Sequence, residues 1–402
     1  MKKKAIPVYL FSFFMIMPVT AVIPVLPVIR DELNASYSQI SFFVACLGIV
    51  RIVLAFPGGF LVDKFDRKKI LLMSSLLSLI GLLILSSSHT IFHLIVSRVL
   101  IGSGSIISVI TVSVLLANIA GLERRGAMMS LIHVVNHAGV IVSAALTGIL
   151  AGWYNWRLPF LVIAGLLLLS AVTVAVLFDN EALVYKGSRT RAGRGPEPFP
   201  KKKFKPGFLK LLPVFAISLF VFFYRSGFRH TLIPFYGKDV LHIDVMALGF
   251  YISMIGCIAM VSIFIFGFLS DRYGRKVALI PGISFSIISV IAILLPRQLN
   301  PLLVACIFVG AGASMNSMPN ILISDLVPSG SLGTAIGTNR FFGDSGFFLG
   351  PLIVGSLLDH LGFRAPLYVI LGFALFALAL ACFFVHNKPL RELEVRDIAP
   401  DL

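Results

Sequence analysis

Charged and titratable side chains inside long apolar segments are the residues of this chain whose chemistry most needs explaining. Five arginines, one aspartate and three histidines are of this kind: Arg51, Arg98, Arg225, Arg229, Arg340, Asp344, His133, His137 and His230. An ionised side chain at lipid depth costs about 3 kcal/mol or more unless it meets water or a partner, so such residues are functional by default. Guanidinium groups recognise carboxylates and phosphates, whereas aspartate and histidine carry protons when burial moves their pKa.

These residue types predict a binding cavity with a proton carrier beside it. Asp344 or His137 is the predicted carrier of a coupling proton. An alternative stays open, in which Arg340 and Asp344 form an i,i+4 ion pair within one helix and the histidines are satisfied core residues. The predicted substrate and cavity residues are Arg51, Arg225, Arg229, Asn136, His137 and Asn316.

The segments that carry these residues are long and apolar. The chain is 58% hydrophobic and only 13% charged, and about 20 apolar residues are needed to cross a hydrocarbon core of about 30 Å. The sequence therefore predicts an all-α membrane protein with twelve transmembrane helices. The predicted spans are 5–29, 38–62, 70–88, 91–119, 127–152, 158–178, 209–235, 246–270, 277–296, 301–325, 334–358 and 363–385.

Basic residues gather on one predicted side of the membrane. Of 34 Lys and Arg, 24 fall in loops and tails on that side, five on the opposite side and five within spans. Cytoplasmic loops carry this excess of positive charge, so both termini are predicted to be cytoplasmic. The net charge of +16 therefore needs no nucleic-acid partner.

The two halves of the chain repeat at an offset of about 207 residues. Trp156-Arg157-Leu158-Pro159 matches Phe363-Arg364-Ala365-Pro366, and His137 matches Asp344. Such repeats are the architecture of secondary transporters, which bind substrate near the midplane between halves. The predicted domains are two six-helix bundles related by a pseudo-twofold, 1–178 and 209–385, a basic cytoplasmic linker, 179–208, and a tail, 386–402.

A ten-residue loop occurs twice, as Gly267-Phe-Leu-Ser-Asp-Arg-Tyr-Gly-Arg-Lys276 and as Gly59-Phe-Leu-Val-Asp-Lys-Phe-Asp-Arg-Lys68. It resembles the signature loop of the major facilitator superfamily, although Asp66 replaces the turn glycine in the first copy. The resemblance implies a latch that holds one conformation and breaks during transport. The alternative is a basic loop that only fixes topology. The predicted gate residues are Gly59, Asp63, Arg67, Gly267, Asp271, Arg272, Gly274 and Arg275.

Arg98-Val-Leu-Ile-Gly102 resembles the family's arginine motif, which implies a role for Arg98 in proton movement. The alternative is that Arg98 extends to the outer surface. Two features depart from the drug-exporter pattern. The stretch from Gly139 to Gly148 lacks the proline associated with antiport, and the first span lacks the acid of many cation exporters.

Together these features predict a secondary transporter in the bacterial cytoplasmic membrane, most similar to the twelve-helix drug/proton antiporters. Proton-coupled export of a small anionic or amphipathic compound is the first choice. The alternatives are an uptake symporter or uniporter for a metabolite, and a receptor or assembly partner that does not transport. No phosphate-binding glycine loop, metal cluster or catalytic domain stands in the sequence, so we expect no enzyme activity and no cofactor. The expected partners are substrate, protons and lipid, and the expected state is a monomer.

Overall fold

The computed structural model describes residues 2–177, 208–295, 300–327 and 331–385. Within these ranges the backbone is almost entirely helical and contains no strand. The side chains of Asp63 and of most residues between 117 and 130 are not described. The predicted tail, and the predicted linker up to residue 207, also lie outside the described residues.

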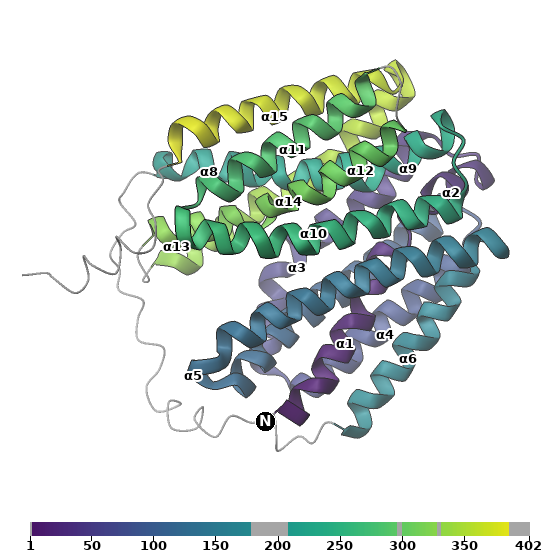
Figure 1. Cartoon of the computed structure of the whole chain (residues 1–402). Coiled ribbons are helices and arrows are strands. Elements are labelled where there is room, and N and C mark those ends of the chain that lie inside the picture. The colour runs from purple at the N-terminus through teal and green to yellow at the C-terminus, as the bar shows by residue number, and fades with distance from the viewer. Residues whose placement is uncertain (1, 178–207, 296–299, 328–330, 386–402) are drawn as a thin grey trace, which may run out of the picture. The chain divides into compact units, whose positions relative to one another are not determined.

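The chain divides into two compact units, which we describe separately. The first comprises Met1–Pro200 and Gly237–Ser253, and the second comprises Lys201–Tyr236 and Met254–Leu402. The division into six-helix bundles at 1–178 and 209–385 stays a prediction. The segment from Gly237 to Ser253 follows the predicted linker in sequence and yet packs in the first unit. The helices of the first unit are α1 (Lys2–Thr20), α2 (Leu26–Glu32), α3 (Tyr37–Lys64), α4 (Arg67–Ser86), α5 (Ile91–Trp153) and α6 (Leu158–Leu177) (Figure 1).

The second unit begins with one span of mixed geometry. It consists of α8 (Phe208–Phe223), the π-helical η2 (Tyr224–Leu232), α9 (Ile233–Phe235) and the π-helical η3 (Tyr236–Val240), whose last residues pass into the first unit. Helix α10 (Val245–Tyr273) returns to the second unit after Ser253. The remaining elements are α11 (Lys276–Leu294), α12 (Pro301–Ala311), the 3₁₀-helical η4 (Gly312–Asn316), α13 (Met318–Leu326), α14 (Leu332–Leu361) and α15 (Arg364–Phe384).

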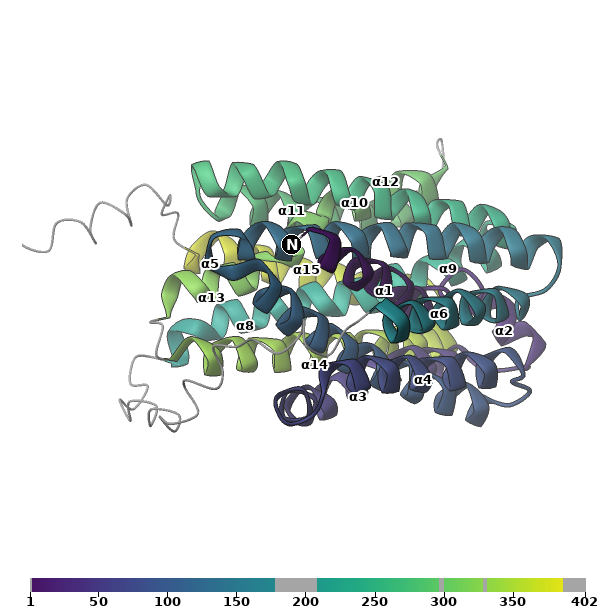
Figure 2. The ribbon, with the colours of Figure 1, turned by 90° about the horizontal axis from the view of Figure 1, so that it is seen from below.

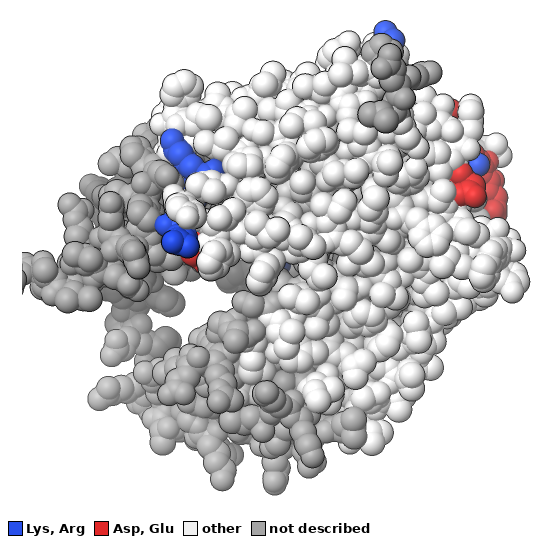
Figure 3. Space-filling view, viewed as in Figure 1, with Lys and Arg blue, Asp and Glu red and all other residues white. Residues whose placement is uncertain are grey.

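Eleven described helical segments are long and apolar enough to cross a membrane, and Ile6–Thr20 is a shorter apolar helix at the first predicted span. On the face drawn in Figure 3, the described surface carries its charged side chains near the ends of the helices and almost none between them. These features confirm the predicted all-α membrane fold. The first span is shorter than predicted because the ring of Pro24 would collide with the carbonyl of Thr20, where α1 ends. Helix α2 then restarts with Pro27 in its first turn.

Two predicted spans are joined in one helix. We expected separate helices over 91–119 and 127–152, but α5 runs through all 63 residues from Ile91 to Trp153. The two predicted spans are confirmed, as Ile91–Leu116 and Leu131–Trp153. The helix continues between them because the connection includes Leu122, Glu123, Arg124 and Arg125, which favour helix, and no proline. Figure 2 shows the α5 ribbon turning sharply near its label, so one helix can supply two spans.

The sequence repeat is also present in the backbone. The loop before α3 and the loop before α10 each contain one residue with left-handed backbone, Asn34 (φ 48°) and His242 (φ 54°). Two residues later, Ser36 and Asp244 each accept a hydrogen bond from a backbone N–H in the first turn of the next helix. These paired positions are 208 residues apart, so the two halves build the same loop from different side chains.

Close packing of α14 on α8 organises the second unit (Figure 1). A Cβ atom on Gly346 would collide with the carbonyl oxygen of Leu219. Nearby, the rings of Phe215 and Phe342 stack with centroids 5.2 Å apart. Small residues allow transmembrane backbones to approach in this way, which increases van der Waals contact between helices.

We predict that Gly346→Ala lowers the stability of the protein by about 1–3 kcal/mol, because the added methyl overpacks a backbone contact. Gly337→Ala is the matched control on the same helix, since no atom lies within 4 Å of a Cβ at Gly337. Thermal unfolding of the purified protein in detergent measures both. Equal melting temperatures for the two variants would show that the α14 contact is not tight.

Candidate functional site

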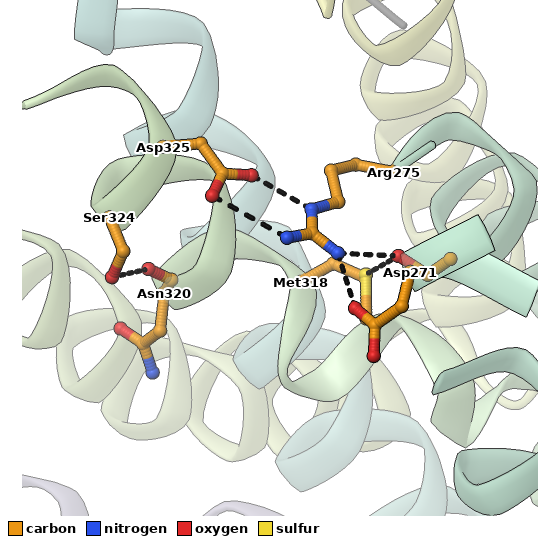
Figure 4. Close-up of polar contacts among 7 residues, drawn as sticks. Asp271, Arg275, Met318, Asn320, Ser324 and Asp325 are labelled. Atoms are coloured by element: carbon orange, nitrogen blue, oxygen red, sulfur yellow. Dashed lines mark hydrogen bonds and ion pairs between the residues drawn. The ribbon is translucent and has the colours of Figure 1, made fainter. Parts of the chain in front are cut away.

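The side chain of Arg275 is the centre of a polar cluster at one end of the second unit (Figure 4). It is only 8% exposed. Its Nε donates to Asp325 Oδ2 at 2.8 Å and one terminal nitrogen donates to Asp271 Oδ1 at 2.7 Å. A third bond, of 3.4 Å, reaches Ser270 Oγ. Burial alone would lower the pKa of Arg275, but the hydrogen bonds and charges of Asp325 and Asp271 raise it above its ordinary value.

Local backbone geometry explains why Arg275 can reach both acids. Helix α10 ends at Tyr273, and Gly274 follows with φ 96°, a conformation that costs glycine little. The chain turns there, so Arg275 lies at the start of α11 while Asp271 remains in the last turn of α10. Asp325 comes from the end of α13, fifty residues away. Sequence reasoning missed Asp325 as a member of this cluster, because no short spacing links it to the loop.

The first copy of the loop has a different structure. Asp66 adopts φ −60° and its side chain accepts a hydrogen bond from Lys68 N, so it caps α4. The position that matches Asp325 is Ala117 or Asn118, neither of which is an acid. Substitution of the turn glycine therefore changes a left-handed turn into an ordinary helix cap.

The remaining gate residues lie around these two loops. Gly59 and Gly267 have open space where a Cβ would stand. Arg67 is half-buried, and Arg272 is exposed with its guanidinium 5.4 Å from the Tyr273 ring centroid. The structure thus brings Asp271, Gly274 and Arg275 together and leaves Gly59, Gly267 and Arg272 outside the cluster.

Arg98 is buried in the first unit, with 2% of its surface exposed. One terminal nitrogen donates to the carbonyl of Val19 at 3.0 Å, and the guanidinium lies 5.4 Å from the Phe43 ring centroid. In a regular helix Ile23 N would bond Val19 O, but it bonds Thr20 O instead. The early end of α1 therefore provides the acceptor for Arg98. This burial does not fit the alternative in which Arg98 extends to the surface.

The other predicted residues of the first unit lie on α3 and α5. Arg51 and His137 are half-buried, and His133 is exposed. Asn136 is half-buried and its Oδ1 accepts a hydrogen bond of 2.8 Å from Ser12 Oγ on α1. That bond gives Asn136 a role in packing α1 against α5.

Arg229 is the more deeply buried of the two predicted cavity arginines in the second unit, with 7% of its surface exposed. It lies in the π-helical η2, within electrostatic reach of Cys306 on α12 and Tyr224. Tyr224 shares a 2.6 Å hydrogen bond with Ser289 on α11. Arg229 forms no salt bridge with any described carboxylate, and its Nε has no described acceptor. Arg225, four residues earlier, is half-buried.

Asp344 is 2% exposed and lies 3.7 Å from the Nε of Arg340, a distance that leaves the ion pair long. The structure thus contains the intrahelical pair of the alternative interpretation, which leaves the role of Asp344 in proton coupling a prediction. Asn316 is half-buried at the end of η4. Among the residues described, no three His, Cys, Asp or Glu side chains are grouped to hold a metal ion.

The predicted cavity residues therefore divide between the units. Arg51, Asn136 and His137 lie in the first, whereas Arg225, Arg229 and Asn316 lie in the second, as does the predicted proton carrier Asp344. Arg229 is the buried arginine of the cavity set, and Arg98, predicted to assist proton movement, is buried in the first unit. A common cavity formed by both groups stays a prediction.

Relatives and solved structures cover nearly the whole chain. The quinolone resistance protein NorA of Staphylococcus aureus (strain COL) is 25% identical over 396 residues, which is 93% of this chain and 95% of the relative. Multidrug resistance protein 1 of Bacillus subtilis (strain 168) is 26% identical over 363 residues, 86% of this chain and 87% of the relative.

Among solved structures, a bacterial homologue of the human lysosomal transporter Spinster superposes with a TM-score of 0.79 at 14% identity, over 97% of this chain and 98% of that one. The xylose transporter XylE of E. coli superposes with a TM-score of 0.77 at 16% identity, over 98% of this chain and 99% of that one. These structures share the fold. The family model described as Major Facilitator Superfamily matches residues 8–351 and 260–399. The chain belongs to the major facilitator superfamily and is an integral, multi-pass membrane transporter.

Proposed function

We propose that this transporter exports a small organic compound of anionic or amphipathic character, in exchange for protons that move the opposite way. The two units would alternate access to the substrate by changing their mutual packing. The loop cluster around Arg275 would face the cytoplasm, together with both termini, in a bacterial inner membrane. The protein would act as a monomer.

The observation that carries the substrate class is the environment of Arg229. A guanidinium at 7% exposure has lost most of its hydration, and an uncompensated buried charge is strongly unfavourable. Carboxylate, sulfonate or phosphate groups would supply the missing negative charge and accept charge-assisted hydrogen bonds from the fork of the guanidinium. Half-buried Arg225 would extend the same positive region.

Export and proton coupling are proposed from the relatives and from the titratable residues within the spans. The names of the relatives, quinolone resistance and multidrug resistance, favour efflux of organic compounds. Asp344 and His137 are the proposed proton carriers, and Arg98 is proposed to assist them from the first unit. The rival proposal is uptake by symport or facilitated diffusion, which the missing proline between Gly139 and Gly148 favours.

Flux measurements in proteoliposomes separate export by antiport from symport. We expect substrate uptake into the lumen to accelerate when the lumen is made acidic, because protons then leave as substrate enters. Acceleration by an acidic exterior would establish symport, and insensitivity to either gradient would establish uniport.

We predict that Arg229→Gln lowers the transport of an anionic substrate about 10- to 100-fold, the loss expected for one charge-assisted hydrogen bond. Arg364→Gln is the control, because Arg364 is an exposed arginine at the start of α15. Melting temperature provides a second readout. If Arg229 binds substrate, removing its buried charge should leave stability unchanged or raise it. Unchanged transport with lowered stability would instead make Arg229 a structural residue.

The contacts around Arg275 predict that three Asp→Asn substitutions slow transport to different extents. Asp325→Asn should slow transport most, because Asp325 bonds two nitrogens of Arg275 and its side chain is 26% exposed. Asp271→Asn should have a smaller effect, since Asp271 is 66% exposed, and Asp63→Asn the smallest, because the first copy lacks a partner like Asp325. Initial transport rates measured at equal protein amounts give the order. Equal or reversed effects of Asp271→Asn and Asp63→Asn would refute it.

A further inference from the structure

The groups that surround Arg229 in the second unit are neutral. Its charge acts on the Cys306 thiol of α12 and on the Tyr224 hydroxyl of η2, two groups that are ordinarily uncharged at pH 7. Among the described residues, no hydrogen bond or ion pair involves Arg229, and no carboxylate is among the groups that its charge reaches. The described part of the protein therefore leaves a full positive charge to be compensated.

A chain of hydroxyl groups on α11 fixes the orientation of the Tyr224 phenol. Ser286 Oγ donates to the carbonyl of Ile283 and Ser289 Oγ donates to the carbonyl of Ser286, both at 2.6 Å. Because Ser289 has used its only hydrogen, the Tyr224 hydroxyl must donate to Ser289 Oγ across their 2.6 Å bond. Only the lone pairs of the Tyr224 oxygen remain for Arg229, and these carry a partial negative charge.

The guanidinium of Arg229 is buried without being sealed. Its Nε is enclosed by protein atoms and has no described acceptor, whereas 7% of the residue's surface stays exposed. The two terminal nitrogens have no described acceptor either, yet they are not among the fully enclosed atoms. An ion that approaches Arg229 would therefore meet these two nitrogens, which carry four of the five N–H donors of the side chain.

The first unit contains a buried guanidinium at the equivalent place, and there the protein supplies the acceptor. Arg98 and Cys306 are equivalent positions of the repeat, 208 residues apart, and Arg229 is likewise equivalent to Ala21, just after the end of α1. Each half thus places one buried arginine where its first and fourth spans meet. Arg98 donates to the carbonyl of Val19 at 3.0 Å. The halves differ because, among the described residues, only Arg98 has such an acceptor.

We propose that Arg229 binds a small inorganic anion, such as chloride, when no substrate is bound. A monovalent, weakly hydrated anion fits this site because its walls include aromatic rings. Tyr224 and Phe228 stack with centroids 5.1 Å apart, and apolar surroundings favour ions that lose their water readily. Fluoride and sulfate hold water more tightly and should bind less. Exchange of the bound anion for an organic acid group rests on the proposed function, whereas binding of the anion itself does not.

Chloride binding is measured on the purified protein in detergent by the broadening of the chloride nuclear magnetic resonance line, with gluconate salts keeping the ionic strength constant. The net charge of +16 makes weak binding of chloride at the surface unavoidable, so the difference between variants decides. We expect Arg229→Gln to weaken the saturable part of the binding about 10-fold or more, the loss expected for a charge-assisted hydrogen bond. Arg229→Lys keeps the charge and should keep part of the binding.

Arg364→Gln is the matched control, because it makes the same chemical change at an exposed arginine, and it should leave the saturable binding unchanged. In the native protein bromide should displace chloride and fluoride should not, a comparison that needs no variant. Circular dichroism establishes that each variant is folded.

Equal saturable binding by the native protein, Arg229→Gln and Arg364→Gln, or no saturable binding at all, would mean adventitious surface ions only and would overturn the proposed anion site. Because this measurement contains no substrate, that result would leave the proposed export untouched. Chloride bound at Arg229 in a protein that moves no organic anion would support the anion site and refute the proposed substrate class.

Discussion

A buried charge must be compensated, and this requirement accounts for much of the structure. Arg275 meets it with two carboxylates at a helix end, and Arg98 with the carbonyl of Val19 and the ring of Phe43. Arg229 has neither kind of described partner. In a static core that would be a defect of several kcal/mol. In a transporter, we propose, an anionic substrate completes this site.

The irregular helices occur where these polar groups lie. Helix α1 stops at Thr20 and so frees the carbonyl that Arg98 uses. The span that carries Arg225 and Arg229 is π-helical from Tyr224 to Leu232. Asn316 ends a 3₁₀ turn between α12 and α13. Departures from α-helical geometry often mark functional positions in transporters, because they expose backbone groups and redirect side chains.

The membrane fold could be predicted from the sequence because apolar length and the positions of loops are local properties. The continuous helix that joins two of the predicted spans in α5 also has a local cause, since helix-forming residues continue through the connection near Arg124. Contacts between distant segments were not predictable in this way. Asp325 meets its arginine partner across 50 residues, and only the packing of helices sets that pair. The sequence shows that the two loops differ, because Asp66 stands where the second copy has Gly274. The consequence, a helix cap in place of a left-handed turn, is seen only in the backbone conformation.

We propose that the buried charge of Arg229 selects an anionic group. A ligand-induced thermal-shift screen of the purified protein against organic carboxylates, phosphates, lipids and cationic drugs tests it most directly. We expect anionic or amphipathic compounds to raise the melting temperature of the native protein and Arg229→Gln to abolish the shift. Stabilisation by organic cations alone, retained in Arg229→Gln, would contradict it.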